Sequence, residues 1–302
     1  MRKISEMKIQ RKPDWLKIKI ENTENFAFVK KIVTEHQLHT ICSSGKCPNQ
    51  CECWSRGTAT FMIMGDVCTR TCRFCATKSG KPLPLDHAEP EKVAESVFLM
   101  KLKHCVITSV DRDDLPDKGA AHWAETVRKI RNRNPNTIIE LLIPDYQNEL
   151  LKMVIDAQPH IIAHNLETVK RLTSVARSKA TYKTSLETLQ QNANSGILTK
   201  TGIMVGLGET ETEVLQTLSD VKNVGVSMIT IGQYLQPTKN NMEVAQYITP
   251  KQFAFYKQYA LNLGFKYVES APLVRSSYMS DKVFLHANDA DCHDLCKSLK
   301  AD

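Results

Sequence analysis

The sequence predicts an α/β protein built as a β/α barrel, partial or closed. Six apolar, β-rich runs alternate along the chain with stretches of helical periodicity. Repeated strand–helix units of this size favour a parallel sheet, and six of them favour a barrel. Distinctive polar strings also follow five of the expected strands: DVCTRTC, SVDRDD, HNLET, GLGE and GQYLQPT. In β/α barrels the active site is built from such loops at the carboxyl ends of the strands.

The strands are expected at residues 58–64, 105–110, 137–143, 160–164, 199–205 and 227–232. Helices are expected between them at residues 89–103, 121–131, 148–157, 184–193 and 211–224. In the first of these helices Val93, Val97 and Met100 fall on one face, and Pro90 occupies an early position that suits a helix start. No internal repeat stands out, which argues against a solenoid.

Three segments are expected along the chain: an N-terminal extension (1–57), the barrel core (58–249) and a C-terminal extension (250–302). Thr249 and Pro250 open a further helix rich in aromatic residues, and Gly264 is expected to end it. We expect its aromatic face to pack against the barrel. Residues 266–277 would then return toward the N-terminal extension, so that both extensions belong to one domain.

Six of the ten cysteines form two triplets. The spacings are C-x4-C-x5-C for Cys42, Cys47 and Cys53, and C-x3-C-x2-C for Cys68, Cys72 and Cys75. A four-iron cluster offers each of its irons an outside ligand, so three thiolates leave one position for another group. A closed zinc site needs four protein ligands, usually in paired halves. The triplets therefore favour catalytic iron–sulfur chemistry, with a zinc loop as the alternative.

Composition limits the other functions. The net charge of +7 is mild for a nucleic-acid-binding protein, in which a concentrated basic stripe is expected. The densest basic segment, residues 2–19, is either a solvated tail or a docking arm for an acidic partner. No apolar run approaches the length of a membrane span, and the first residues lack the apolar region of a secretory signal. Clusters held by thiolates require a reducing compartment, so a cytoplasmic location is expected.

The second triplet, with Phe74 directly before Cys75, resembles the signature of radical S-adenosylmethionine (SAM) enzymes. The resemblance implies a [4Fe-4S] cluster on Cys68, Cys72 and Cys75 whose open iron binds SAM. It also implies cleavage of SAM to a 5'-deoxyadenosyl radical and a partial (β/α)6 TIM-like barrel with N- and C-terminal extensions.

The first triplet, extended as CPNQCECW (47–54) and followed by GTATFMIMGD (57–66) and PLVRSSY (272–278), resembles the lipoyl synthase family. Matching strings run from about residue 10 to residue 279. The resemblance implies a sulfurtransferase that places sulfur at carbons 6 and 8 of an octanoyl group on a carrier lysine. It also implies an auxiliary, sacrificial [4Fe-4S] cluster on Cys42, Cys47, Cys53 and Ser277, with Ser276 the less favoured serine. No catalytic residue beyond the cluster ligands is implied.

The same resemblance assigns SAM contacts to residues after the strands. GIMVGLGE (202–209) is similar to a looser family pattern that lines the adenine site, although a plain strand-end turn would look the same. Arg112 could clamp a carboxylate, because its guanidinium suits paired hydrogen bonds, and His164 is expected to be structural. The implied SAM contacts are Ser109, Asp111, Asn165, Glu167, Gly206, Gly208 and Glu209.

Four cysteines lie outside the triplets. Cys51 offers a competing register for the first triplet, and Cys105 is expected to be a small core residue. Cys292 and Cys296, with His293, form an incomplete metal site without an assigned role. Expected partners are octanoylated lipoyl domains of 2-oxoacid dehydrogenase complexes, the glycine-cleavage H protein and a ferredoxin or flavodoxin-type electron donor, with no nucleic acid and no membrane. The rival interpretations are a different sulfur-inserting radical enzyme, a two-cluster electron carrier and a zinc-binding module.

Overall fold

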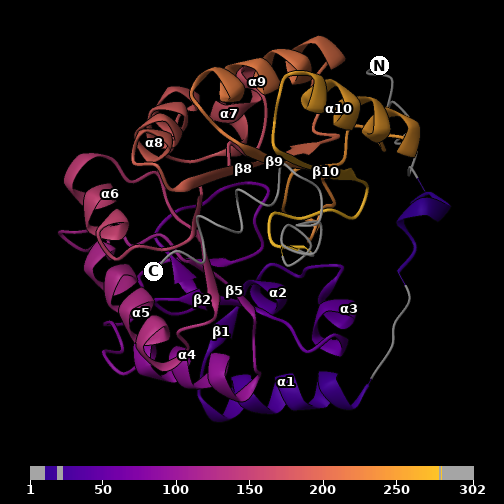
Figure 1. Ribbon diagram of the computed structural model, residues 1–302. Helices are drawn as coiled ribbons and strands as arrows, with labels where there is room; N and C mark the ends of the chain where they lie inside the picture. The colour runs from indigo at the N-terminus through magenta and orange to yellow at the C-terminus, as the bar shows by residue number, and fades with distance from the viewer. Residues whose placement is uncertain (1–10, 19–22, 279, 281–302) are drawn as a thin grey trace.

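The computed structural model describes residues 11–18, 23–278 and 280 of the 302-residue chain. One curved sheet forms its centre, with helices around the outside (Figure 1). The strand order is β1-β2-β5-β6-β7-β8-β9-β10, and every neighbouring pair is parallel except β1 with β2. The strands are β1 (His39–Thr40), β2 (Thr60–Ile63), β5 (His104–Ser109), β6 (Ile138–Leu142), β7 (Ile161–Ala163), β8 (Leu198–Val205), β9 (Met228–Gln233) and β10 (Tyr267–Ala271).

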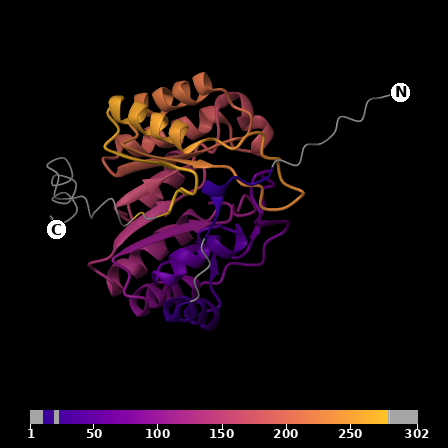
Figure 2. The same cartoon turned by 90° about the vertical axis from the view of Figure 1, so that its right-hand side faces the viewer.

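The prediction of a partial barrel is confirmed. All six predicted strands are present as β2, β5, β6, β7, β8 and β9. The edge strands β1 and β10 do not pair with each other in the described part of the chain, so the sheet stays open along one side. Figure 2 shows the N-terminal helices and α10 (Pro250–Asn262) at opposite ends of the curved sheet.

The helices that cover the sheet lie close to their predicted positions. They are α4 (Glu89–Leu99), α5 (Ala120–Arg133), α6 (Asn148–Ile155), α8 (Tyr182–Asn194) and α9 (Glu211–Asn223), together with α10. Their first turns carry local signals that favour a helix start: Thr210 and Glu213 form a capping box, and Thr249 caps α10 ahead of Pro250. Elements without a predicted counterpart are a 3-10 turn (Asp14–Leu16), α1 (Glu24–Glu35), α2 (Ile41–Ser44), α3 (Gln50–Ser55), α7 (Lys170–Ala176), and the paired strands β3 (Val67–Cys68) and β4 (Lys78–Ser79).

The C-terminal extension contributes a strand that the sequence did not reveal. Residues 267–271 form β10, which pairs with β9 as a seventh parallel strand. Only alternate residues of β10 are buried, so its sequence, YVESA, lacks the apolar run of the central strands. On α10 the expected packing holds for Phe253 and Tyr256, which are buried, whereas Phe255 stays exposed. Cys105 is fully buried in the core, as predicted.

The interior of the barrel contains a buried ion pair. Lys200 and Glu140 are each 1% exposed, and Nζ lies 2.6 Å from Oε1. Lys200 also donates to the Ser280 hydroxyl at 3.1 Å, which ties the C-terminal segment to β8. Burial alone would raise the pKa of Glu140, but the charge of Lys200 and a hydrogen bond from His104 outweigh it and lower that pKa to about 2.

We expect Lys200→Met to destabilise the protein by about 3–5 kcal/mol, because it leaves the Glu140 carboxylate buried without its cation. Urea unfolding at neutral pH measures the loss. Lys152→Met is the matched control, since it removes a lysine that pairs with Asp156 at the same 2.6 Å on the surface. An equal loss in both variants would contradict the assignment.

The same pair predicts a pH dependence. The folded pKa of Glu140, about 2, lies below its ordinary value of 4.5. Its contribution to stability is therefore fully present above about pH 4.5 and is lost as the pH falls toward about 2. Unfolding free energies measured across this interval should fall less steeply in a Lys200→Met, Glu140→Gln double variant than in the wild type.

Candidate active site

A cavity of about 540 Å³ occupies the interior of the barrel. Its lining includes residues from both ends of one strand, His104 at the start and Ser109 at the end of β5. The seven predicted cluster ligands all line this one cavity: Cys42, Cys47, Cys53, Cys68, Cys72, Cys75 and Ser277. Cys51 is not among the lining residues, so the structure favours the Cys53 register for the first triplet.

Cys42 lies on α2 and Cys53 on α3, and Cys47 lies in the tight loop that joins these two short helices. The amide of Cys47 donates to the Cys42 carbonyl at 3.0 Å, and the amide of Cys53 donates to the Asn49 carbonyl at 2.9 Å. Asn49 is buried and donates through Nδ2 to the Leu273 carbonyl at 2.7 Å. The loop of the first triplet is therefore attached directly to the C-terminal extension.

The three thiols of this triplet are close enough to affect each other electrostatically. Burial raises the pKa of Cys42, Cys47 and Cys53. For Cys53 the next causes are the charges of Cys42 and Cys47, and its pKa reaches about 12. Without a metal the three thiols therefore stay protonated at neutral pH. A metal that they bind as thiolates must displace their protons. Burial and mutual repulsion of this kind suit thiols that share one cationic centre.

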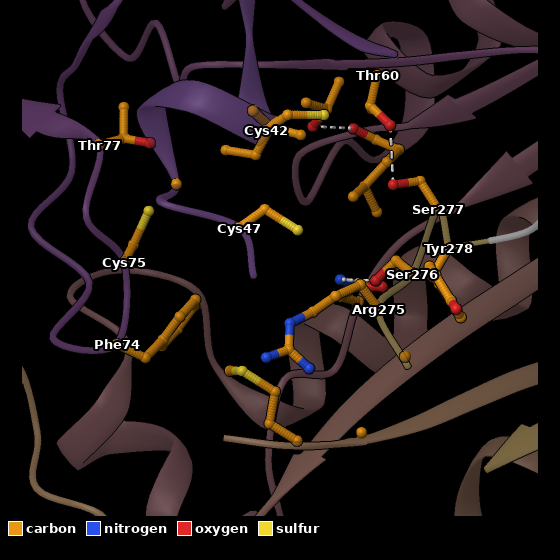
Figure 3. Close-up of a pocket in the computed structure, with 18 of the residues that line it drawn as sticks. Cys42, Cys47, Thr60, Phe74, Cys75, Thr77, Arg275, Ser276, Ser277 and Tyr278 are labelled. Carbon is orange, nitrogen blue, oxygen red and sulfur yellow. Dashed lines mark hydrogen bonds between the residues drawn. The ribbon is translucent and has the colours of Figure 1, made fainter. Parts of the chain in front are cut away.

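The RSSY string of the C-terminal extension lies against these cysteines (Figure 3). Ser277 Oγ accepts a hydrogen bond from Thr60 at 2.8 Å, and Ser276 Oγ accepts one from Asn165 at 2.7 Å. The segment crosses β9 closely, because a Cβ atom at Gly232 would lie 2.1 Å from the Val274 carbonyl oxygen. Glycine is thus required at position 232 for the segment to reach the cavity.

The second triplet lies in the loop that follows β2, which the short strands β3 and β4 close. Cys68 Sγ accepts hydrogen bonds from the amides of Arg70 (3.4 Å) and Asp111 (3.3 Å). Burial raises the pKa of Cys68 to about 12, with the nearby Asp111 carboxyl as the next cause. Asn241 holds the far end of the loop by donating to the Cys75 carbonyl at 2.8 Å.

Arg70, between the first two cysteines of this triplet, was missed by the sequence reasoning. Its side chain is 5% exposed and binds Asp113 through Nε and Asp145 through Nη1, at 2.9 Å and 2.6 Å. Asp111 lies 3.4 Å from the same Nη1. These carboxylates raise the pKa of Arg70 further although burial opposes it. The arginine therefore fixes the cluster loop to the loops after β5 and β6. One signal could have pointed to Arg70. It lies in the string CTRTC, and the acidic string DRDD follows the next strand, so both were expected in active-site loops at the same end of the barrel.

The residues that line the cavity include several with a polar side-chain atom that is buried without a hydrogen-bond partner in the described part of the chain, and Ser109 Oγ and Asn165 Oδ1 are two of these atoms. Glu167 and Asp111 also line the cavity, and burial raises the pKa of both carboxyls. Arg177, which the sequence reasoning did not assign, lines the same region. Unsatisfied oxygens and carboxyls beside three thiols fit a ligand with amino and hydroxyl groups, as SAM has.

The glycine-rich string 202–209 reaches the cavity only with its first residues, Gly202, Ile203 and Met204. Gly206, Gly208 and Glu209 are not among the lining residues, so their contact with SAM stays a prediction. The Glu209 carboxylate accepts hydrogen bonds from the amides of Gly206 and Leu207 and so shapes the turn itself. A Cβ atom at Gly206 would lie 2.1 Å from Gln233 Nε2. Close packing against the end of β9 therefore accounts for that glycine.

Two further expectations are resolved by the geometry. Arg112 is buried and forms a paired contact with the Asp114 carboxylate, both bonds at 2.9 Å, so the carboxylate that its guanidinium holds here belongs to the chain itself. His164 is structural, as expected, because its two ring nitrogens contact the Ile143 carbonyl and the Ser185 hydroxyl. Cys292, His293 and Cys296 lie outside the described residues.

Comparison with known proteins agrees with this geometry. The family model of the radical SAM superfamily matches residues 62–221. Among solved structures, methylornithine synthase aligns with a TM-score of 0.52, 16% identity and 72% coverage of each chain. An [FeFe]-hydrogenase maturase from Carboxydothermus hydrogenoformans aligns with a TM-score of 0.55 and 12% identity, covering 75% of this chain and 65% of that one. Fold and family match define the class: a radical SAM enzyme.

Curated relatives narrow the class. The lipoyl synthase of Parabacteroides distasonis is 61% identical over 274 residues, 90% of this chain and 98% of its own. Those of Bacteroides thetaiotaomicron and Treponema denticola are 58% and 54% identical, each over 90% of this chain and 97% and 95% of their own. The chain belongs to the lipoyl synthase family. In its described part no helix is long and apolar enough to cross a membrane.

We expect Arg70→Leu to lower the unfolding free energy by about 3–5 kcal/mol, because Asp145 loses its cation and Asp113 keeps only Lys179, at 3.3 Å. The iron content after reconstitution should fall as well, because Cys68 loses its support. Arg171→Leu is the control: Arg171 makes the same paired contact, to Glu213, but on the surface. A surface pair contributes far less, so the prediction fails if the two variants unfold alike.

Proposed function

We propose that this protein inserts two sulfur atoms, at carbons 6 and 8, into an octanoyl group carried on a lysine of a lipoyl domain or a glycine-cleavage H protein. The observation that carries the proposal is that two cysteine triplets, each one ligand short of a four-iron cluster, line the same cavity. The proposal is supported by the 61% sequence identity with the lipoyl synthase of Parabacteroides distasonis over 90% of the chain.

The two triplets have separate tasks in this proposal. Cys68, Cys72 and Cys75 would hold the cluster that binds SAM. When bound, that cluster and SAM supply a 5'-deoxyadenosyl radical that removes hydrogen from unactivated carbon. The chain itself provides the surroundings: Arg70 fixes the loop, while Ser109, Asp111, Asn165 and Glu167 offer polar groups for SAM. Gly206, Gly208 and Glu209 remain proposed contacts of the adenine.

Cys42, Cys47, Cys53 and Ser277 would hold the second cluster, which is a substrate because it supplies the sulfur. A serine oxygen is a harder ligand than thiolate and a poorer match for sulfide-bridged iron. Ser277 is thus suited to release its iron as sulfur leaves. A cavity lined by both triplets would keep the acyl chain close to both clusters.

The rim of the cavity bears positive charge. Lys12, Lys46 and Arg56 are exposed and belong to its lining. Together with the net charge of +7 they suit the approach of an acidic carrier domain. The same face would also receive a small acidic electron donor of the ferredoxin or flavodoxin type. Because all of this chemistry requires reduced thiolates, we propose that the protein works in the cytoplasm.

The division of labour predicts the products of single substitutions. After anaerobic reconstitution with iron and sulfide, the wild type should convert an octanoyl-lysyl peptide to the dithiolated form with reductant and SAM. Cys53→Ala should still form 5'-deoxyadenosine but add no sulfur, because only the first triplet is broken. Cys72→Ala should form neither. Mass spectrometry of the peptide and of deoxyadenosine measures both.

Cys51→Ala is the matched control, since Cys51 lies two residues from Cys53 on the same helix and does not line the cavity. It should keep both activities. Deoxyadenosine without any sulfur from the wild type would retain a radical enzyme and refute this substrate. No deoxyadenosine from a fully iron-loaded wild type would refute the proposed function.

A further inference from the structure

Thr60 makes the hydrogen bond on which this inference is based. It is the first residue of β2, it is 6% exposed, and its side chain lines the cavity. Its Oγ1 donates to Ser277 Oγ at 2.8 Å (Figure 3). A strand from the start of the barrel is thereby joined to the C-terminal extension at the serine that the proposed function uses as a ligand.

Thr60 also contacts the first triplet. Burial raises the pKa of Cys42, and a hydrogen bond from the Thr60 backbone amide is the largest effect that opposes this rise. Thr60 therefore contacts two of the proposed ligands: its backbone amide contacts the Cys42 thiol, and its side chain contacts Ser277. The two contacts can be separated by experiment, because a side-chain substitution leaves the amide in place.

The backbone around Ser277 is held independently of Thr60. Ser276, Tyr278 and Ser280 each have a partner on a different element: Asn165 at 2.7 Å, Glu52 at 2.9 Å and Lys200 at 3.1 Å. With the segment fixed on both sides, Ser277 retains only the choice among its staggered rotamers. The hydrogen bond from Thr60 selects the one in which the hydroxyl points to Thr60, in the wall of the cavity that the first triplet also lines.

We propose that Thr60 is a positioning residue: its hydroxyl holds the Ser277 side chain toward the first triplet and so determines how firmly that site retains iron. The inference rests on the proposed function only in taking Ser277 as a ligand. Groups that orient a metal ligand typically change metal affinity by about 10- to 100-fold when removed. A hydroxyl, which binds iron less readily than thiolate, depends on such orientation more than a cysteine would.

The test measures iron release and not turnover. In a Cys68→Ala, Cys72→Ala, Cys75→Ala background only the first triplet can be loaded. The reconstituted protein, without SAM or peptide, is mixed with a colorimetric ferrous chelator under anaerobic conditions. Thr60→Val replaces the hydroxyl by a methyl group of the same shape, and we expect it to release iron about tenfold faster. Thr60→Ser, which restores the donor, should release iron at the rate of the parent protein.

Thr137→Val is the matched control. Thr137 is 7% exposed, directly precedes β6 and donates to the Leu102 carbonyl at 2.6 Å, but it does not line the cavity. It should release iron at the parent rate. The proposal is overturned if Thr60→Val matches the parent, if the control releases iron as fast as Thr60→Val, or if Thr60→Ser fails together with the valine variant.

The outcome is independent of the sulfur-insertion assay. Faster release from Thr60→Val in a protein whose wild type makes no dithiolated peptide would keep this inference and remove the proposed substrate. If the wild type makes the dithiolated peptide but Thr60→Val does not change the rate of iron release, the proposed substrate is kept and this inference is removed. If Thr60→Val takes up no iron while Thr60→Ser does, the role of the hydroxyl is supported directly.

Discussion

The open side of the sheet is the constraint on which the rest of the structure depends. Strands β1 and β10 form its two edges and do not pair in the described residues. The extensions that precede and follow the barrel close this side with side-chain contacts, from Asn49 to the Leu273 carbonyl and from Tyr278 to Glu52. The same contacts bring the cysteines of one extension to the serine of the other. Closing the open side and bringing together the residues of the proposed auxiliary site therefore depend on the same contacts.

The buried carboxyl groups of the interior fall into two sets, which differ in the direction of their pKa shifts. Asp113 and Asp145 are neutralised by Arg70, and Glu140 by Lys200, and the pKa of each of these carboxyls is lowered. Asp111 and Glu167 differ, because burial raises the pKa of both. Both line the cavity. The close pairs of Arg70 and Lys200 thus hold the chain together. In the cavity wall, Arg70 and Arg177 only partly offset the burial of Asp111 and Glu167, which lie where SAM is proposed to bind.

The sequence was sufficient to predict the central strands and helices, but not how the two extensions close the open side of the sheet. The six central strands are apolar runs, and helix starts such as Thr210 carry capping residues, so local patterns sufficed for them. Strand β10 was missed because half its residues are polar, and it exists only through pairing with β9. The cysteines could be assigned from their spacing, since ligands close in sequence remain close in space. Spacing could not reveal the roles of Arg70, Thr60 and Arg177, because each of these residues contacts a partner from another segment of the chain.

The hydrogen bond from Thr60 to Ser277 spans 217 residues of the chain. During translation the cysteines of the first triplet emerge early, whereas Ser277 follows after roughly 10–40 s at the usual rate of synthesis. Throughout that interval the nascent chain exposes thiols that can oxidise or take up the wrong metal. With Ser277 as the proposed fourth ligand, insertion of the complete auxiliary cluster would therefore follow synthesis of the C-terminal extension. A protein made faster than its irons are supplied would accumulate with correctly folded strands and an empty, oxidation-prone sulfur-donor site.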